Sequence, residues 1–402
     1  MVLGHEIFKG DKNAKAGTVV PIAFPVIAGS GTLTTVMSLK ANYDNIVILA
    51  GILINLVVIY AALKSLKLVE RALGEAGLLA LTKRYGIKIP LVASCMDTVC
   101  ESEMAIALAE MGGVGCIHRF MSIEHQAEDV KATADAFAQL NLSSIWKLEE
   151  SNFTIKQIPL IAAVGANGDY LERAIELVKT GANIILIDVA HGHHENVKQA
   201  LQTLRSTLPT HVDFIAGNIA SAKAAKDLED WGADCLRTGV GGGSLCTTRL
   251  KTGFGVPNVT CLQEVIATTS IPVMADGGIR TSGDIAKALA LGSSSVMLGS
   301  LIAGTKEAPG QIIEKTGGLY KRYRGAASLE TKSVHGQERR NVEGESTVIP
   351  FKGGVKFVVE SLLDGVRSAL SYGGANNLKE FKPEYVQVTN AGLAEARPHL
   401  IF

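Results

Sequence analysis

The stretch that decides the fold runs from Pro272 to Ser300 and reads "PVMADGGIRTSGDIAKALALGSSSVMLGS". Two short apolar runs, "PVMADGG" and "SVMLGS", flank an amphipathic segment, "SGDIAKALALGS". Continuous apolar runs separated by a helical period are typical of parallel strands that helices cover. The stretch is therefore predicted to be a strand–helix–strand unit of a parallel sheet.

Six more apolar runs of the same kind precede this unit, with amphipathic stretches such as "YLERAIELVKTGA" between most of them. They are residues 89–94, 113–118, 160–165, 183–189, 212–217 and 235–240. Eight strand–helix units within about 210 residues match the size of a closed (β/α)8 TIM barrel. We therefore predict an α/β protein with this barrel, and an open, doubly wound sheet is the alternative.

The remaining chain divides around this barrel. Residues 1–85 are predicted to form an atypical N-terminal segment, and residues 86–402 the barrel catalytic domain. After the eighth strand, residues 320–352 are polar and charged and too long for a turn, which favours a mobile flap. The segment at 355–374 is predicted to be a closing helix that docks on the barrel.

The N-terminal segment contains an apolar stretch, residues 46–63, with 18 residues and no charge. This length is the lower limit for a membrane span, and no basic region precedes it as in a signal peptide. A buried strand and helix, a membrane anchor and a gene-model artefact all remain open. We expect no membrane attachment, but this stretch leaves it possible.

Charge and cysteine usage restrict the function classes. Lys and Arg together number 39, as do Asp and Glu, so no overall basic field indicates a nucleic-acid partner. The six cysteines show no CxxC spacing, which favours a reducing compartment, and we expect the cytoplasm. The histidine cluster "HGHH" at 191–194 is only a weak indication of metal binding.

A TIM barrel carries its site at the C-terminal ends of the strands. The motifs "DGGIRTSGD" (276–284) and "MLGS" (297–300) follow the last two predicted strands, where glycines let backbone amides approach an anion. Together they predict a phosphate site, although tight turns alone would also favour glycine.

A cysteine lies in the glycine-rich loop "TGVGGGSLCTTRLKTGFG" (238–255). Backbone amides, Thr247, Thr248 and Arg249 surround Cys246 in the sequence. Such surroundings can lower the pKa of a thiol and make it a nucleophile. Cys95 and Cys116 are better suited to ordinary packing.

Several motifs together resemble the IMP dehydrogenase/GMP reductase family. They include "IPLVASCMDTVCESEMAIALAEMGGVGCIH", "IDVAHGHH", "GVGGGSLCTTR" and "YRGAAS", and the resemblance runs from about Lys88 to His399. It implies a barrel that binds a purine nucleotide, a nicotinamide cofactor, a covalent bond from Cys246 to purine C2, and a homotetramer. Only about 40 residues separate the second and third strands, too few for the CBS modules that many dehydrogenases of the family insert there.

Within the family, the flap favours a reductase. Dehydrogenases activate water with an Arg-Tyr pair, but no tyrosine occurs between Ala326 and Pro350. Instead "ERRNVEGES" resembles the reductase flap, whose glutamate corresponds to Glu343. We expect GMP reductase, which converts GMP to IMP and ammonia with NADPH. The alternative is IMP dehydrogenase, which oxidises IMP to XMP with NAD, because "DVAHGHH" and "TNAGLAEARPHL" resemble bacterial dehydrogenases.

The resemblance also assigns roles to residues. The catalytic residues would be Cys246, Thr248 and Glu343. The substrate would be bound by Ser94, Met96, Ser244, Asp276, Gly277, Gly278, Gly299, Ser300, Tyr323 and Arg340. The cofactor would be bound by Asp188, Val189, Ala190, Asn218 and Arg237. A monovalent cation such as K⁺ would bind at Gly241, Gly243 and Cys246, although "GGG" at 241–243 replaces the family's Gly-Pro-Gly.

Overall fold

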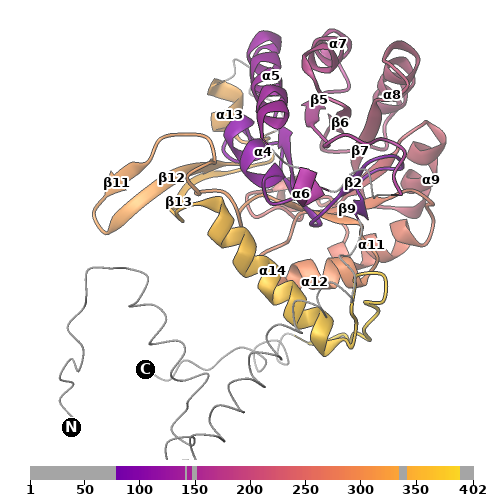
Figure 1. The fold of residues 1–402 in the computed structure, drawn as a ribbon, viewed down its shortest axis with the longest axis vertical. Coiled ribbons are helices and arrows are strands. Elements are labelled where there is room, and N and C mark those ends of the chain that lie inside the picture. Colours follow the sequence, from indigo (N-terminus) through magenta and orange to yellow (C-terminus); the bar gives the residue numbers. More distant parts are fainter. Residues whose placement is uncertain (1–77, 141–142, 147–151, 335–341, 390–402) are drawn as a thin grey trace, which may run out of the picture. The chain divides into compact units, whose positions relative to one another are not determined.

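A computed structural model describes residues 78–140, 143–146, 152–334 and 342–389, and its centre is a closed barrel of eight parallel strands (Figure 1). The strands follow each other around the barrel in sequence order, and β10 closes it by pairing with β3. They are β3 (Leu91–Ala93), β4 (Val114–Ile117), β5 (Ile161–Val164), β6 (Ile184–Asp188), β7 (Asp213–Ile219), β8 (Cys235–Thr238), β9 (Val273–Asp276) and β10 (Ser295–Leu298). Each strand overlaps one predicted apolar run. The TIM barrel is confirmed, and the open-sheet alternative is wrong.

Helices follow the strands and form the outer layer. They are α4 (Ser102–Ala109), α5 (Ile123–Gln139), α6 (Ser143–Trp146), α7 (Tyr170–Thr180), α8 (Glu195–Thr207), α9 (Ala222–Asp230), α10 (Thr248–Thr252), α11 (Asn258–Ile266), α12 (Ser282–Ala290), α13 (Leu329–Val334) and α14 (Val355–Tyr372). Several begin where a hydroxyl can satisfy a free backbone N–H. Ser122, Ser221 and Thr281, for example, cap α5, α9 and α12 in this way.

The apolar core has two layers. An outer cluster fills the space between strands and helices, and an inner cluster fills the barrel itself. A short hairpin, β1 (Leu79–Ala80) and β2 (Gly86–Ile87), adds Leu81, Tyr85 and Ile87 to the inner cluster. The hydroxyl of Tyr85 donates to the carbonyl of His211 at 3.0 Å, just before β7 begins. Residues 79–85, which the sequence placed in the N-terminal segment, thus pack against the N-terminal end of the barrel.

A three-stranded antiparallel sheet follows the barrel strands and lies outside their ring (Figure 1). Its strands are β11 (Ile313–Lys315), β12 (Gly318–Arg324) and β13 (Ser346–Pro350). The ammonium of Lys321, only 2% exposed, donates to the carbonyls of Thr305 and Lys306 and so ties β12 to the loop after β10. The predicted flap therefore contains ordered strands, and its residues 335–341 lie outside the described residues.

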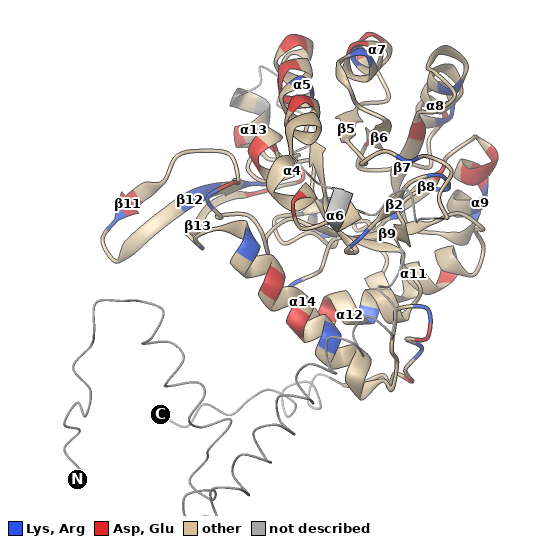
Figure 2. Cartoon of the chain, viewed as in Figure 1, with Lys and Arg blue, Asp and Glu red and all other residues tan. Residues whose placement is uncertain are grey.

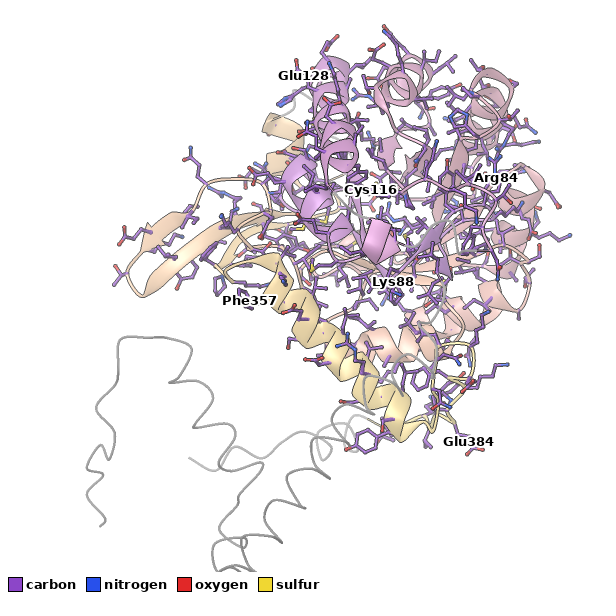
Figure 3. All side chains as sticks on the ribbon, in the orientation of Figure 1. Arg84, Lys88, Cys116, Glu128, Phe357 and Glu384 are labelled. Atoms are coloured by element: carbon purple, nitrogen blue, oxygen red, sulfur yellow. The ribbon has the colours of Figure 1, made fainter. Side chains whose placement is uncertain are left out.

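Helix α14 packs against α12 and α4, as expected for the predicted closing helix. The charged side chains of α14 are Lys356, Glu360, Asp364 and Arg367, with the two acidic residues between the two basic ones (Figure 2). Cys116 lies inside the barrel domain (Figure 3), and of the six cysteines only Cys246 is not buried. This distribution agrees with the prediction that Cys95 and Cys116 are packing residues.

Candidate functional site

A cavity of about 500 Å³ opens at the C-terminal ends of the strands. It brings together most of the residues that the sequence assigned to the site. The predicted residues that line it are Ser94, Met96, Asp188, Val189, Ala190, Asn218, Arg237, Gly241, Gly243, Ser244, Cys246, Thr248, Asp276, Gly277, Tyr323 and Glu343. Gly278, Gly299 and Ser300 do not line it, and Arg340 lies outside the described residues.

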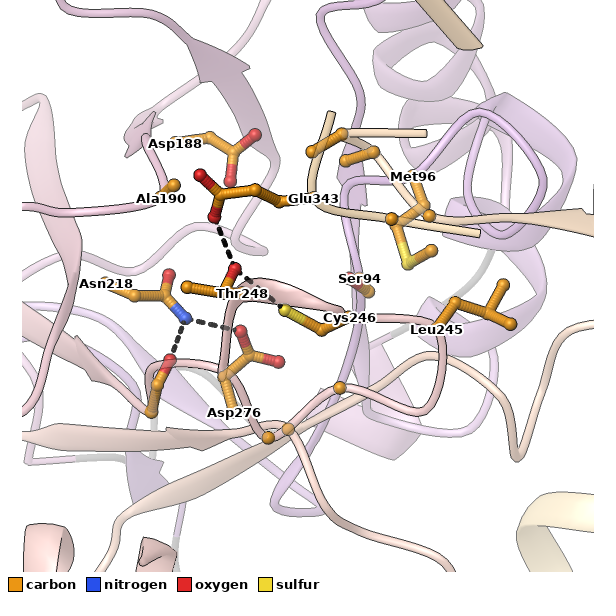
Figure 4. Close-up of a pocket in the computed structure, with 18 of the residues that line it drawn as sticks. Ser94, Met96, Asp188, Ala190, Asn218, Leu245, Cys246, Thr248, Asp276 and Glu343 are labelled. Atoms are coloured by element: carbon orange, nitrogen blue, oxygen red, sulfur yellow. Dashed lines mark hydrogen bonds between the residues drawn. The ribbon is translucent and has the colours of Figure 1, made fainter. Parts of the chain in front are cut away.

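The cysteine is the first member of a hydrogen-bonded chain of three side chains (Figure 4). The thiol of Cys246 donates to Thr248 Oγ1 at 3.2 Å, and the Thr248 hydroxyl donates to Glu343 Oε2 at 2.5 Å. A hydroxyl can accept one proton while it donates another. The chain can therefore carry a proton between the sulfur and the carboxylate.

Backbone pairing holds Glu343 in this place. The N–H of Thr247 donates to the carbonyl of Glu343 at 2.9 Å, and the N–H of Glu345 donates to the carbonyl of Leu245 at 3.0 Å. Cys246 and Gly344 form an antiparallel bridge between them. The segment before β13 is thus paired directly with the cysteine loop, although about 95 residues separate the two in sequence.

Two glycines shape the loops under the cavity. Gly239 has φ +122°, and a Cβ there would overlap the carbonyl oxygen of Asp276. Gly277 has φ +83°, and its Cβ would lie 3.1 Å from the backbone of Gly242. Positive φ strains other residues, so this close contact between the β8 and β9 loops requires glycine at both positions.

A buried arginine joins two carboxylates on the cavity wall. Arg237 Nη1 lies 2.5 Å from Asp188 Oδ1, and its Nη2 lies 3.0 Å from Asp276 Oδ2. Asn218 donates to the same Asp276 oxygen at 2.7 Å (Figure 4). Burial alone would raise the pKa of Asp188, but the charges of Arg237 and Arg119 hold it below its ordinary value. Burial alone would lower the pKa of Arg237, but Asp276, Cys95 and Asp188 raise it well above the usual range. Asp188 and Arg237 are therefore both charged at neutral pH.

The other wall of the cavity carries hydroxyl groups. The hydroxyls of Ser244 and Tyr323 lie 3.1 Å apart, and a Cβ on Gly299 would lie 3.2 Å from the Tyr323 oxygen. Burial raises the pKa of Tyr323, so its hydroxyl keeps its proton at neutral pH and can donate to an anion. Gly299 and Ser300, which do not line the cavity, contact this wall through Tyr323.

The cavity residues that the sequence did not predict include Arg119 and Phe120, which follow β4. The available signal was position alone, because a cation next to a strand end of a TIM barrel faces the site.

The structure gives the histidine cluster structural roles. His193 Nε2 lies 2.8 Å from Asp227 Oδ2, its ring stacks on Trp231, and His194 caps α8. Within the described ranges, no three His, Cys, Asp or Glu side chains are grouped so that they could hold a metal ion. The K⁺ site at Gly241, Gly243 and Cys246 stays a prediction. The Gly243 carbonyl accepts the N–H of Cys246 at 3.1 Å.

The helices in the described part of the chain are too short or too polar to cross a membrane. The apolar stretch at 46–63 lies outside the described residues.

Comparison with known proteins gives two family matches. Residues 78–399 match the IMP dehydrogenase / GMP reductase domain. Residues 6–102 match the MarC family integral membrane protein, and this range overlaps the first match at 78–102, which includes β3 of the barrel.

Individual proteins agree with the first match. Inosine-5'-monophosphate dehydrogenase of Borreliella burgdorferi is 36% identical over 368 residues, which cover 80% of this chain and 91% of that protein. The enzyme of the same name from Cryptosporidium parvum is 39% identical over 359 residues, which cover 79% and 88%. The crystal structure of a GMP reductase variant from Trypanosoma brucei, in complex with guanosine 5'-monophosphate, is similar with a TM-score of 0.73 and 30% identity, covering 81% of this chain and 93% of that one. This chain therefore belongs to the IMP dehydrogenase/GMP reductase family of oxidoreductases.

Proposed function

We propose that this protein is a GMP reductase, which converts GMP to IMP and ammonia with NADPH in purine nucleotide interconversion. The observation that carries the proposal is the contact of Thr248 with both the Cys246 thiol and the Glu343 carboxylate. A deaminating reaction at purine C2 needs a nucleophile and a nearby acid that protonates the departing amine. The three side chains supply both from one side of the cavity.

The first half of the reaction uses the hydrogen-bonded chain of Cys246, Thr248 and Glu343. The thiol proton passes through Thr248 to Glu343, and the Cys246 sulfur forms a bond to C2 of GMP. The same proton then returns through Thr248 to the 2-amino group, the C2–N bond breaks, and ammonia leaves. Atoms balance, because the proton that leaves the thiol departs on ammonia and the purine stays bound to sulfur.

In the second half, hydride reaches C2, the C–S bond breaks with its electrons on sulfur, and IMP is released. Bound NADPH supplies the hydride. The role of the protein in this step is to let the Cys246 sulfur leave as a thiolate and to keep water away from C2. The backbone pairing of Glu343 and Gly344 with the cysteine loop covers this side of the cavity and supports that role.

The cavity wall fits the remaining parts of the two ligands. Ser244 and Tyr323 offer hydroxyl donors for the nucleotide phosphate, supported by the amides of the glycine loops. Asp276, which is paired with Arg237, can accept the ribose hydroxyls. On the far side of Cys246, the carboxylate of Asp188 and the amide of Asn218 are suited to the ribose and carboxamide of a nicotinamide nucleotide.

The second candidate is IMP dehydrogenase, because curated relatives with 31–39% identity carry that name. It would use the same thiol at C2 of IMP but needs a base that activates water. The absence of tyrosine between Ala326 and Pro350 favours the reductase. The test incubates the full chain with GMP plus NADPH, and separately with IMP plus NAD, and follows the absorbance of the reduced nicotinamide. Loss of absorbance only with GMP is expected, and a gain only with IMP would replace the proposal with the dehydrogenase.

A cytoplasmic location stays a prediction from cysteine usage, and a homotetramer and K⁺ binding stay predictions from the family resemblance. The MarC match over residues 6–102, together with the uncharged stretch at 46–63, favours the alternative of membrane attachment. Cell fractionation tests it with the full chain and with Leu56→Lys, because a lysine near the centre of a span disfavours insertion by about 2.5–3.5 kcal/mol. Attachment would be supported if the unchanged protein is found in the membrane fraction and the Leu56→Lys variant is found in the supernatant. Full recovery of both proteins in the supernatant would reject it.

A further inference from the structure

Arg119 is a cation that the mechanism above does not use. It follows β4 and lines the cavity, close to Asp188. Its neighbour His118 is 1% exposed and fixes the turn: His118 Nδ1 accepts the backbone N–H of Phe120 at 3.1 Å, so Nε2 carries the hydrogen and donates to Glu101 Oε1 at 3.1 Å. The turn that carries Arg119 is thus anchored to Glu101, which immediately precedes α4.

The guanidinium of Arg119 has spare capacity to interact with a ligand. Its carbon lies 4.9 Å from the centre of the Phe120 ring, and its Nε is 3.6 Å from Asp188 Oδ2, beyond hydrogen-bond distance. The Nε atom is buried without a hydrogen-bond partner in the described structure. Arg237, in contrast, has close partners in Asp188 and Asp276.

The charges of the four linked side chains Asp188, Asp276, Arg237 and Arg119 balance. Asp188 and Asp276 contribute two negative charges, and Arg237 and Arg119 contribute two positive ones. Without Arg119, one negative charge would be in excess beside Asp188. An excess negative charge attracts a cation, and the oxidised nicotinamide ring is a cation whereas the reduced ring is neutral.

We propose that Arg119 is a specificity-determining residue that disfavours the oxidised, cationic nicotinamide and so favours binding of the reduced dinucleotide. This inference rests on the proposed function, since it requires the nicotinamide to lie beside Asp188. It explains how a cavity with two carboxylates avoids holding the oxidised product of the reductase reaction. The phosphates of the dinucleotide do not enter the comparison, because the oxidised and reduced forms carry the same ones.

The test measures binding rather than turnover. In the full chain with Cys246→Ala, which prevents the covalent step, the dissociation constants of NADP⁺ and NADPH are measured by calorimetry at saturating GMP. The ratio of the two constants is compared with that after adding Arg119→Gln or Arg119→Lys. Lys179→Gln is the matched control, because it removes one charge from the surface of α7, where the side chain is 73% exposed.

Arg119→Gln is expected to shift the ratio about tenfold toward NADP⁺, the size that Coulomb's law gives for one charge about 12 Å away at an effective permittivity of about 20. Arg119→Lys should restore most of the original ratio, and Lys179→Gln should leave it unchanged. If Arg119→Gln weakens both dinucleotides equally, Arg119 faces their phosphates and the inference is wrong. If neither dinucleotide binds before Arg119 is changed, the proposed function fails instead.

Discussion

Replacing Arg237 with methionine tests whether the site is held together by charge. Met has a similar length but no cation, so Asp188 and Asp276 lose the guanidinium that lies 2.5 Å and 3.0 Å from them. The side chains of Arg237, Asp188 and Asp276 are only 8%, 13% and 17% exposed, so water replaces little of the lost interaction. Removal of one partner from a buried ion pair costs about 3–5 kcal/mol. We expect Arg237→Met to lower the free energy of unfolding by that amount at neutral pH.

The pH dependence of the free energy of unfolding provides a second, independent test of the role of Arg237. In the unchanged protein the pKa of Asp188 is depressed, so its contribution to stability is complete above the unfolded pKa of about 3.9 and is lost as the pH falls through the folded pKa. In Arg237→Met, burial should raise the folded pKa of Asp188 above that of the unfolded chain. The variant should then gain stability as the pH falls from about 7 towards 4. The difference between its free energy of unfolding and that of the unchanged protein should therefore become smaller.

The assay is urea unfolding of the full chain, followed by circular dichroism, at about pH 7.5 and about pH 5. Arg367→Met is the control, because Arg367 pairs with Asp364 on the surface of α14 with 68% of its side chain exposed. Arg367→Met should not change the urea midpoint at either pH, since exposed ion pairs contribute little to stability. A deficit of less than about 1 kcal/mol for Arg237→Met at neutral pH, or a deficit that grows in acid, would refute the reasoning.

Three further predictions concern the reaction. Cys246→Ala should abolish GMP-dependent NADPH oxidation while calorimetry still detects GMP binding, and normal turnover would exclude the covalent step. Glu343→Gln should slow ammonia release by about 10²–10⁴-fold, the usual contribution of a general acid, and slow hydride exchange between cofactor and IMP far less; equal slowing would remove its role as the acid. Tyr323→Phe should weaken GMP binding about tenfold, the effect of one hydrogen bond to a charged group, without changing the binding of guanosine, which lacks the phosphate. Equal weakening of both ligands would place Tyr323 away from the phosphate.

The barrel could be predicted because parallel strands covered by helices are apolar on both faces. Most of the eight runs, such as "IILID" in β6, are continuous rather than alternating, and this pattern needs no long-range information. The hairpin at residues 79–87 has no such pattern. Its two strands have two residues each, and its place depends on contacts of Tyr85 with His211, far away in sequence. The sequence therefore predicted the barrel but not what packs against its N-terminal end.

For the site too, the sequence predicted which residues meet but not the contacts that their side chains make. Side chains at strand ends, such as Asp188 and Asp276, meet because the barrel places all strand ends together. The ion pairs that Arg237 makes with both of them depend on side-chain directions that no local pattern contains. Arg119 was missed for this reason, since no local pattern shows that its side chain lies 3.6 Å from Asp188.

The choice between reductase and dehydrogenase depends on what reaches purine C2 after the thiol has reacted. In the proposed mechanism the barrel, the cysteine loop and Asp276, which is proposed to bind the ribose, would serve both reactions equally, so overall similarity does not separate them. A reductase needs an acid for the amine, and a dehydrogenase needs a base for water. The Glu343 carboxylate, 2.5 Å from Thr248 Oγ1, can carry the thiol proton to the amine, and the segment from Ala326 to Pro350 offers no tyrosine that would activate water. The distinction therefore lies in one short segment before β13, and the response of ammonia release to Glu343→Gln measures it directly.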